Sequence, residues 1–321
     1  MRLPAVCLVL LAACGSAPEI RREPAVEEAD RERQLKLEDQ KRRDFRTVLV
    51  RLDQAIDSYA AALSNQGEAR ADAQAERLYK AIHEMVLDLG PMLVKRKSEP
   101  VRPGETFERL RDLATNTENP SDQGLALAAL GFSGRHEVMP TILQGAQLGD
   151  PKVVDCAVLG LAVLRAPATP PGVFETIFRN GKHSEEGRVQ AAWALYRVQT
   201  ASPPSDALAG IWRRTLNDAA SMPAGVVVSA LRGLGFARDS KDGALAAPFL
   251  KDATPRVRMA AALALGRMNA QEQWPALVDA LGPHETVQNV RLHARKALAA
   301  LAGGADHGYD VLAWRKTFTR G

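Results

Sequence analysis

The chain contains very little cysteine, which limits the covalent links available to it. Only three of its 321 residues are cysteine. Cys7 and Cys14 lie in the first fifteen residues, so Cys156 is the one cysteine in the remainder. A single thiol cannot form an internal disulfide, and we expect Cys156 to pack as a small apolar side chain in a helix.

The chain also lacks an excess of charge of either sign. It has 42 Lys and Arg residues against 38 Asp and Glu residues, a formal net charge of +4. Removal of a leader containing Arg2 would reduce this to +3, because the 38 acidic residues would then face 41 basic ones. A balance this close to neutral does not favour nucleic-acid binding. We therefore expect no nucleic-acid partner.

Motifs that carry chemistry are missing as well. The sequence has no Gly-x-Ser-x-Gly elbow, no His-Glu-x-x-His pair and no glycine-rich phosphate loop. From these absences we predict that the protein is not an enzyme, that it has no cofactor or metal ion, and that it has no evident small-molecule substrate.

The apolar run at the N-terminus is short. Residues 3–11 follow a single basic residue and span far less than the roughly 20 residues that a membrane helix needs. A short basic start and then a brief apolar run are typical of a secretory signal peptide, which is excluded from the fold. We assign residues 1–13 to it.

The end of this segment, Leu11-Ala12-Ala13-Cys14, resembles the lipobox of bacterial lipoproteins. The resemblance implies a diacylglycerol on the Cys14 thiol, cleavage before Cys14 and acylation of the new N-terminus, so that the membrane is a partner. Two or three acyl chains anchor a protein stably, whereas one does not. Because Gly15 comes next, the resemblance implies the outer membrane of a Gram-negative cell, facing the periplasm. An ordinary signal peptide that happens to contain cysteine is the alternative.

The next segment, residues 14–44, is dense in charge. Residues 19–46 hold nine acidic and nine basic side chains, and opposite charges recur four positions apart. Such pairs favour a helix, each by about 0.2–0.5 kcal/mol. No apolar stripe precedes Phe45, so this helix would have nothing to bury. We predict a solvated spacer, either helical or disordered.

Residues 45–97 are predicted to form an antiparallel helical hairpin. Apolar side chains recur there at alternating spacings of four and three, which is typical of packed helices. They are Phe45, Leu49, Leu52, Ile56, Tyr59 and Leu63, then Leu78, Ile82, Met85 and Leu89. Gly90-Pro91 is expected to end or kink the second helix. The hairpin either caps the first repeat of residues 104–321 or makes a coiled-coil contact with a partner.

One spacing recurs six times in residues 104–321. Six leucines each come four positions after an alanine and one position after a small residue, at separations of 31, 34, 39, 31 and 33 residues. These leucines, called the signature leucines below, are Leu130, Leu161, Leu195, Leu234, Leu265 and Leu298. Self-similarity at this period predicts a stacked α-solenoid, in an all-α fold. A generic alanine-rich helical bundle is the alternative.

The repeats resemble the HEAT-repeat family, including the short HEAT-like repeats of phycobilisome lyases. Residues 254–266 and 290–298 carry the likeness most clearly. The resemblance implies about six helical pairs. It also implies a closing helix at the C-terminus, where Leu312 and Trp314 would cover the last repeat.

One HEAT-repeat enzyme family, deoxyhypusine hydroxylase, binds iron through His-Glu pairs in its repeat helices. Three such dipeptides occur here, beginning at His83, His136 and His284. In that family the pair lies six and five positions before the signature leucine. None of the six repeats has His-Glu there. The comparison gives no metal site.

The remaining candidate is a binding surface. The resemblance implies that the second helix of each pair lines the concave side, and we place Arg179, Trp212, Arg213, Arg214 and Trp274 on those helices. Arginine and tryptophan are enriched at interaction hot spots, although both tryptophans could instead belong to the core. We therefore predict a membrane-anchored, non-catalytic scaffold that binds proteins in the cell envelope. The alternative is an enzyme or enzyme subunit with a metal or substrate site in the concave groove.

Overall fold

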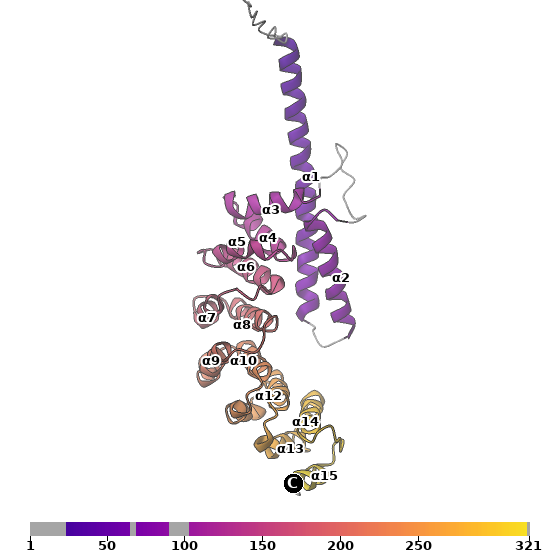
Figure 1. The fold of residues 1–321 in the computed structure, drawn as a ribbon, viewed down its shortest axis with the longest axis vertical. Coiled ribbons are helices and arrows are strands. Elements are labelled where there is room, and N and C mark those ends of the chain that lie inside the picture. Colours follow the sequence, from indigo (N-terminus) through magenta and orange to yellow (C-terminus); the bar gives the residue numbers. More distant parts are fainter. Residues whose placement is uncertain (1–23, 65–68, 90–102, 320–321) are drawn as a thin grey trace, which may run out of the picture. The chain divides into compact units, whose positions relative to one another are not determined.

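The computed structural model describes residues 24–64, 69–89 and 103–319, and every element in these ranges is helical (Figure 1). The signal peptide and lipobox, with Leu11, Ala12, Ala13 and Cys14, lie outside the described residues. The α-helices are α1 (Pro24–Ser64), α2 (Ala69–Val86), α3 (Glu105–Asn116), α4 (Pro120–Gly131), α5 (Met139–Gly145), α6 (Pro151–Leu164), α7 (Pro171–Arg179), α8 (Glu185–Gln199), α9 (Asp206–Asn217), α10 (Ala224–Ala237), α11 (Gly243–Ala246), α12 (Pro255–Met268), α13 (Trp274–Leu281), α14 (Gln288–Leu301) and α15 (Val311–Thr319). Short 3₁₀ helices are η1 (His136–Val138), η2 (Ala219–Ser221), η3 (Ser240–Asp242), η4 (Ala247–Lys251) and η5 (Gln271–Gln273).

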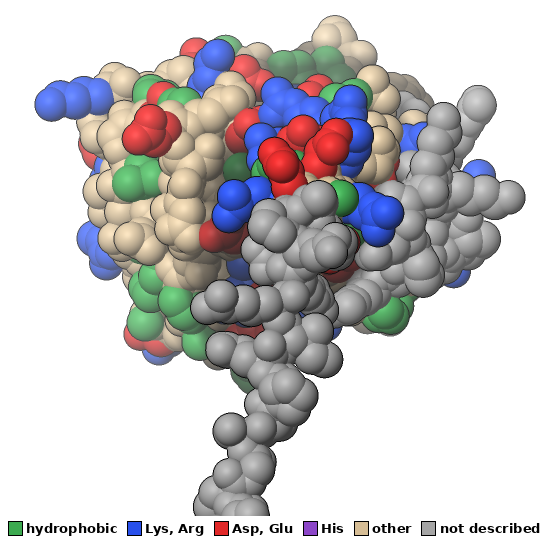
Figure 2. All heavy atoms as spheres, turned by 90° about the horizontal axis from the view of Figure 1, so that it is seen from above, with side chains coloured by type: hydrophobic (Ala, Val, Ile, Leu, Met, Phe, Trp, Pro, Cys, Tyr) green, Lys and Arg blue, Asp and Glu red, His purple; other side chains and the backbone are tan. Residues whose placement is uncertain are grey.

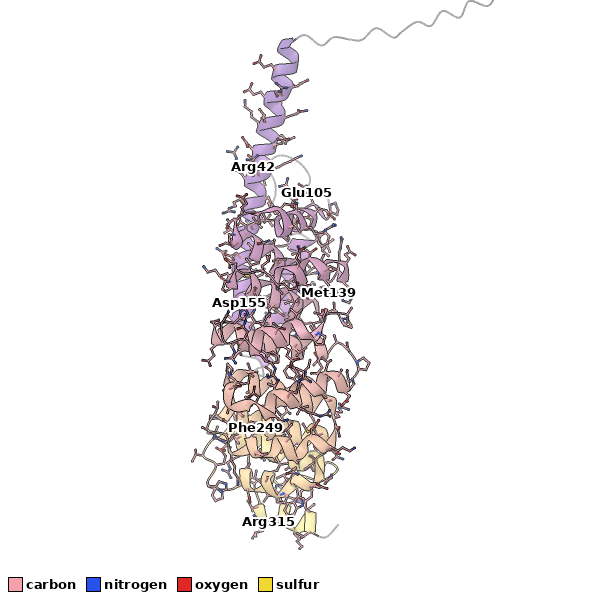
Figure 3. All side chains as sticks on the ribbon, turned by 90° about the vertical axis from the view of Figure 1, so that its left-hand side faces the viewer. Arg42, Glu105, Met139, Asp155, Phe249 and Arg315 are labelled. Atoms are coloured by element: carbon pink, nitrogen blue, oxygen red, sulfur yellow. The ribbon has the colours of Figure 1, made fainter. Side chains whose placement is uncertain are left out.

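The chain divides into two units, residues 1–46 and 47–321. In the first, the charged segment forms the N-terminal part of α1, and its side chains point away from the helix on all sides (Figure 3). Lys36 and Glu32 form an ion pair of 2.7 Å one turn apart. Figure 2, which looks at the molecule from above, shows acidic and basic side chains next to each other in the upper middle of the view. Of the two alternatives for this spacer, residues 24–44 adopt the helical one.

None of the helices in the described ranges is both long enough and apolar enough to cross a bilayer.

In the second unit, residues 47–64 of α1 and the whole of α2 form the predicted hairpin. Leu52 and Ile82 are fully buried on its inner faces. The rings of Tyr59 on α1 and Tyr79 on α2 both contact Phe132, with centroids 5.0 and 5.6 Å from it. Because Phe132 comes directly after α4, the hairpin packs on the beginning of the repeat array.

The second hairpin helix ends earlier than its apolar pattern indicated. It stops at Val86, and Asp88 adopts a left-handed conformation with φ of 54°. The Asp88 carboxylate accepts hydrogen bonds from the backbone N–H and the hydroxyl of Thr106, each at 2.7 Å. Leu89, which we expected on the buried face, is 44% exposed. The chain therefore leaves the helix at Asp88, whose side chain fixes the start of α3.

The repeat array is an α-solenoid of six HEAT-like helical pairs, as predicted. Each signature leucine lies on the second helix of its pair and is fully buried. The pairs are α3 with α4, α5 with α6, α7 with α8, α9 with α10, α11 and η4 with α12, and α13 with α14.

The second helices pack against one another at backbone distance, because small residues line their contacts. A Cβ atom added to Gly131 of α4 would overlap the backbone of Gly160 of α6. One added to Gly266 of α12 would lie 2.9 Å from the Cα atom of Ala297 of α14. The first helices contact one another much less. The array consequently curves, with α8, α10, α12 and α14 on its inner side and α7, α9 and α13 on its outer side (Figure 1).

The closing helix α15 covers the last pair as expected, but through one of the two predicted side chains. Trp314 is fully buried, and its indole N–H donates to the carbonyl of Gly308 at 3.0 Å. Leu312 points outward and is 78% exposed. Asp310 caps the helix start through the N–H groups of Leu312 and Ala313, which turns Leu312 to the solvent side.

Candidate functional site

The first predicted contact residue, Arg213, is held by a cluster of carboxylates. It lies on α9 and forms ion pairs with Asp206 at 2.7 Å, Asp239 at 3.1 Å and Asp242 at 2.7 Å. The hydrogen bonds to Asp242 and Asp206 raise the pKa of its guanidinium above the ordinary value. This side chain connects α9 to η3 of the next repeat.

The other two predicted arginines also have acidic partners within the chain. Arg179 on α7 and Arg214 on α9 share the carboxylate of Glu175, at 3.1 and 3.0 Å. Arg179 additionally lies 3.4 Å from Asp218. These bonds connect one repeat to the next on the outer side of the array.

The two predicted tryptophans differ in exposure. Trp212 is fully buried and stacks on Phe178, with ring centroids 6.0 Å apart. It therefore belongs to the core and presents no surface to a partner. Trp274 is half-buried and stacks on Phe318 of the closing helix at 5.4 Å.

These five residues lie on the opposite side of the array from the one we expected. They are on α7, α9 and α13, which are the first helices of their pairs and line the outer side. From the sequence we took α7, α9 and α13 as the second helices of their pairs, whereas each is the first helix of the pair that follows. The second helices are the ones that carry the signature leucines, and they line the inner side. Figure 3 looks at the outer side, where Met139 and Phe249 lie on the first helices of two pairs.

The inner side carries a different set of arginines. Helices α10, α12 and α14 contain basic residues but no Asp or Glu. Arg232 on α10 and Arg256 and Arg267 on α12 form no ion pair with a carboxylate anywhere in the described ranges. By contrast, the three predicted arginines on the outer side all do. We call Tyr196, Arg232, Arg256 and Arg267 the basic face.

The members of the basic face are close neighbours although they come from three repeats. Arg267 donates to the hydroxyl of Tyr196 at 3.5 Å, and these residues are 71 positions apart in the sequence. Helix α10 lies between them, so the contact spans the inside of the curve. Burial lowers the pKa of Arg232, Tyr196 opposes that shift, and the charges of Arg256 and Arg267 lower the pKa further. Two of the three groups that act on Arg232 are therefore positively charged, as Arg232 itself is.

The sequence carries a signal for this surface. Arg232 lies two positions before its signature leucine, and Arg267 lies two positions after its own. At about 100° per residue, both offsets point away from the buried leucine. Basic residues at these offsets, on helices without acidic residues, indicate an exposed positive surface.

A pocket lies at the end of the array nearest the hairpin. Its volume is about 520 Å³, and it is an open pocket lined by residues of α1, α2 and the C-terminal ends of α6 and α8. Two arginines, Arg165 and Arg197, lie in its wall. Its lining consists of Tyr59, Leu63, Asp72, Ala75, Glu76, Tyr79, Val163, Leu164, Arg165, Arg197 and Ala201.

The histidines and the free thiol are not gathered into a site. His83 contacts the carbonyl of Phe132 at 2.7 Å, whereas Glu285 is paired with Arg258 far along the array. Within the described ranges, no three His, Cys, Asp or Glu side chains come together as a metal site. Burial, together with the charge of Asp155, raises the pKa of the Cys156 thiol to about 11. The thiol is therefore protonated at neutral pH.

Comparison with known proteins gives structural similarity only. No family model matches the sequence, and no curated protein matches it. An engineered protein is 19% identical, covers 62% of this chain and 97% of its own, and has a TM-score of 0.44. The complex of CpcE and CpcF of phycocyanin lyase from Nostoc is 14% identical over 82% of this chain and 94% of its own, with a TM-score of 0.38. Human deoxyhypusine hydroxylase, solved with glycerol, is 16% identical over 84% of this chain and 95% of its own, with a TM-score of 0.29.

These comparisons require a correction. From the missing motifs we predicted that the chain is not an enzyme, and that prediction is wrong. Two of the three similar structures are named as a lyase and a hydroxylase, so a helical-repeat fold does not exclude catalysis. The chain is a HEAT-like α-solenoid, and the fold leaves its chemistry to particular side chains.

Proposed function

We propose that this chain is a lipid-anchored helical-repeat protein of the bacterial cell envelope that binds an acidic protein partner on its basic face. The lipobox ending at Cys14 supports the anchor and the outer-membrane location. The charged helix that begins at Pro24 supports a spacer between the lipid and the folded part. The curved array supplies an extended inner surface of the kind that repeat proteins use for binding.

One observation carries the proposal: arginines are paired on the outer side of the array, whereas Arg232, Arg256 and Arg267 on its inner side have no carboxylate partner in the described ranges. A half-buried guanidinium without a carboxylate is partly desolvated, and its charge is not neutralised within the described part of the chain. Arg232 is such a group, and its two neighbours carry the same charge. An acidic partner would supply the missing carboxylates and would be steered to the surface by their charge.

The proposal is tested by site-specific photo-crosslinking in the cells that make the protein. A photoreactive side chain replaces Leu263, a half-buried residue that lies between Arg256 and Arg267 on the same face of α12. The matched control places the same group at Lys251, an exposed position in η4 on the outer side. We expect a defined adduct from position 263 and none from position 251.

Charge reversal makes the test specific for the basic face. Arg232→Glu with Arg267→Glu should remove the adduct at position 263. Lys182→Glu with Lys241→Glu makes the same change in net charge at exposed positions outside the basic face and should leave the adduct in place. An adduct that survives the inner reversal, or that is lost equally in both double variants, would refute the proposal.

A further inference from the structure

We propose that the pocket between the helical hairpin and the ends of α6 and α8 binds a small amphipathic monocarboxylate, meaning one carboxylate carried on an apolar body. This site is separate from the basic face. It requires Arg165 and Arg197, whereas partner binding is assigned to Arg232, Arg256 and Arg267.

The first support is a pair of unsatisfied donors in the pocket wall. The Nε atoms of Arg165 and Arg197 are buried and have no hydrogen-bond partner. They are the two buried side-chain nitrogen or oxygen atoms left unpaired in the described part of the chain. Buried polar groups in folded proteins are nearly always paired, so each exception calls for a missing partner. Both of these exceptions lie in the lining of one pocket.

The second support is that both guanidinium groups are held in position before any ligand arrives. Arg165 ends α6 in a left-handed conformation with φ of 51°, and its Nη2 donates to Thr200 at 3.2 Å. The Arg197 guanidinium lies over the ring of Trp193, 5.6 Å from its centroid.

The third support is the sign and number of the surrounding charges. Burial lowers the pKa of Arg197, and Arg165 lowers it further, while Tyr59 opposes both effects. Asp72 and Glu76 line the pocket from α2, but both are exposed, and neither forms an ion pair with the arginines in the described ranges. An anion is therefore favoured between the arginines. A dianion would be repelled by the two rim carboxylates, which points to a single negative charge.

The remaining lining defines the rest of the ligand. Leu63, Ala75, Val163, Leu164 and Ala201 form an apolar wall beside the arginines. A volume of about 520 Å³ is in the range of small-ligand pockets, roughly 300–1,000 Å³. A guanidinium group binds a carboxylate through two parallel hydrogen bonds.

The Tyr59 hydroxyl adds a donor to the wall. Tyr59 is buried, with only 4% of its surface exposed, and this burial raises the pKa of its hydroxyl group. It therefore stays protonated at neutral pH and can donate to a bound carboxylate.

Titration calorimetry with defined probes tests this assignment. The full chain is used with Cys14→Ser, so that no detergent is needed to keep a lipidated protein in solution. Octanoate is compared with 1-octanol and octylammonium, which share its apolar body but not its charge. We expect octanoate to bind at least about tenfold more tightly than either, a difference of about 1.4 kcal/mol. Equal binding of octanoate and 1-octanol would overturn the proposal.

Two further probes define the source and the charge of the ligand. An apolar hexapeptide is titrated with a free and with an amidated C-terminus. Preference for the free peptide over octanoate assigns the site to a chain terminus, and the reverse order assigns it to a free amphipathic acid. Tighter binding of octyl phosphate than of octanoate would overturn the assignment to a monocarboxylate.

Substitution of the arginines separates a binding role from a structural one. Arg197→Met retains apolar cover for Trp193 and removes the unsatisfied donor. We expect it to abolish octanoate binding while the melting temperature stays the same or rises. A fall in melting temperature would show that Arg197 is a structural group and would overturn the proposal.

Arg165→Gln provides a second test of the same kind, and it should also abolish octanoate binding without lowering the melting temperature. Arg179→Met, whose arginine is paired on the outer side, is the matched control and should bind octanoate as the unchanged protein does. The basic-face variant, Arg232→Glu with Arg267→Glu, should still bind octanoate. The two proposals can therefore fail separately.

Discussion

The indole N–H of Trp212 donates a hydrogen bond of 2.8 Å to the side-chain oxygen of Gln199, and both side chains are fully buried. The Gln199 amide in turn donates to the carbonyl of Gly233 at 3.1 Å. One glutamine thereby connects α8, α9 and α10 in the middle of the array. A buried polar network of this kind is stabilising when complete and costly when one member is removed.

Replacing Trp212 should test this network. Trp212→Phe removes the donor and leaves the Gln199 oxygen buried without a partner, which costs about 1–3 kcal/mol in the free energy of unfolding. Chemical denaturation measures the change. Trp274→Phe is the control, because Trp274 is half-buried and can keep its stacking on Phe318. Equal effects of the two substitutions would contradict the network.

Two glycine substitutions should have opposite effects. A Cβ atom on Gly233 would overlap the indole of Trp212, so Gly233→Ala should destabilise the protein by about 1–3 kcal/mol. On Gly210 of α9 the added Cβ would lie 3.7 Å from the Arg214 guanidinium, an ordinary contact. Gly210→Ala should therefore stabilise by about 0.5–1 kcal/mol, because alanine restricts the unfolded chain. Thermal melts of the two variants compare the signs directly.

The ion pair between Arg258 and Glu285 should make stability depend on pH. Its atoms lie 2.7 Å apart, and the two side chains are 15% and 8% exposed. Burial raises the pKa of Glu285, but the hydrogen bonds from Arg258 and from the Val287 N–H together bring it below the ordinary value of 4.5. Because the folded pKa is the lower one, the pair stabilises the fold above pH 4.5. This contribution is lost as the pH falls through the folded pKa.

Glu285→Gln should therefore lower stability at neutral pH and flatten the acid limb of the profile between about pH 5 and pH 3. Denaturation at a series of pH values provides the measurement. Glu137→Gln alters an exposed carboxylate and should leave the slope unchanged. An identical acid limb in Glu285→Gln and the unchanged protein would rule out this role.

The lipid anchor gives a prediction about location. Cys14→Ser should move the protein from the membrane fraction to the soluble fraction of the envelope, because the thioether that holds the acyl chains cannot form. Fractionation combined with mass spectrometry of the N-terminal peptide tests this. Recovery of the unchanged protein without any acyl group would contradict the anchor.

The solenoid could be predicted from the sequence because its cause is local. A leucine with small residues one and four positions earlier defines a helix stripe that packs closely, and the stripe repeats at the length of a helical pair. The spacing does not show which neighbouring helix completes each pair. That information lies in contacts such as those of α7 with α8, and without it the wrong helices are assigned to the inner side.

The partners of individual arginines could not be predicted for a related reason. Arg213 is paired with Asp239 and Asp242, which lie 26 and 29 positions away in the next repeat. The pocket arginines Arg165 and Arg197 meet Tyr59 from a hairpin far earlier in the chain. Such groups meet only because the repeats stack, so no short motif records them.

The inner and outer arginines differ in what they do for the fold, and melting temperatures of two single variants with the same chemical change test this difference most directly. Arg213→Met should lower the melting temperature by roughly 2–4 °C, because Asp242 is left buried without its partner. Arg232→Met should leave it unchanged or raise it, because a half-buried guanidinium with like-charged neighbours is removed. A fall in Arg232→Met equal to that in Arg213→Met would contradict the claim that the inner arginines lack acidic partners within the chain.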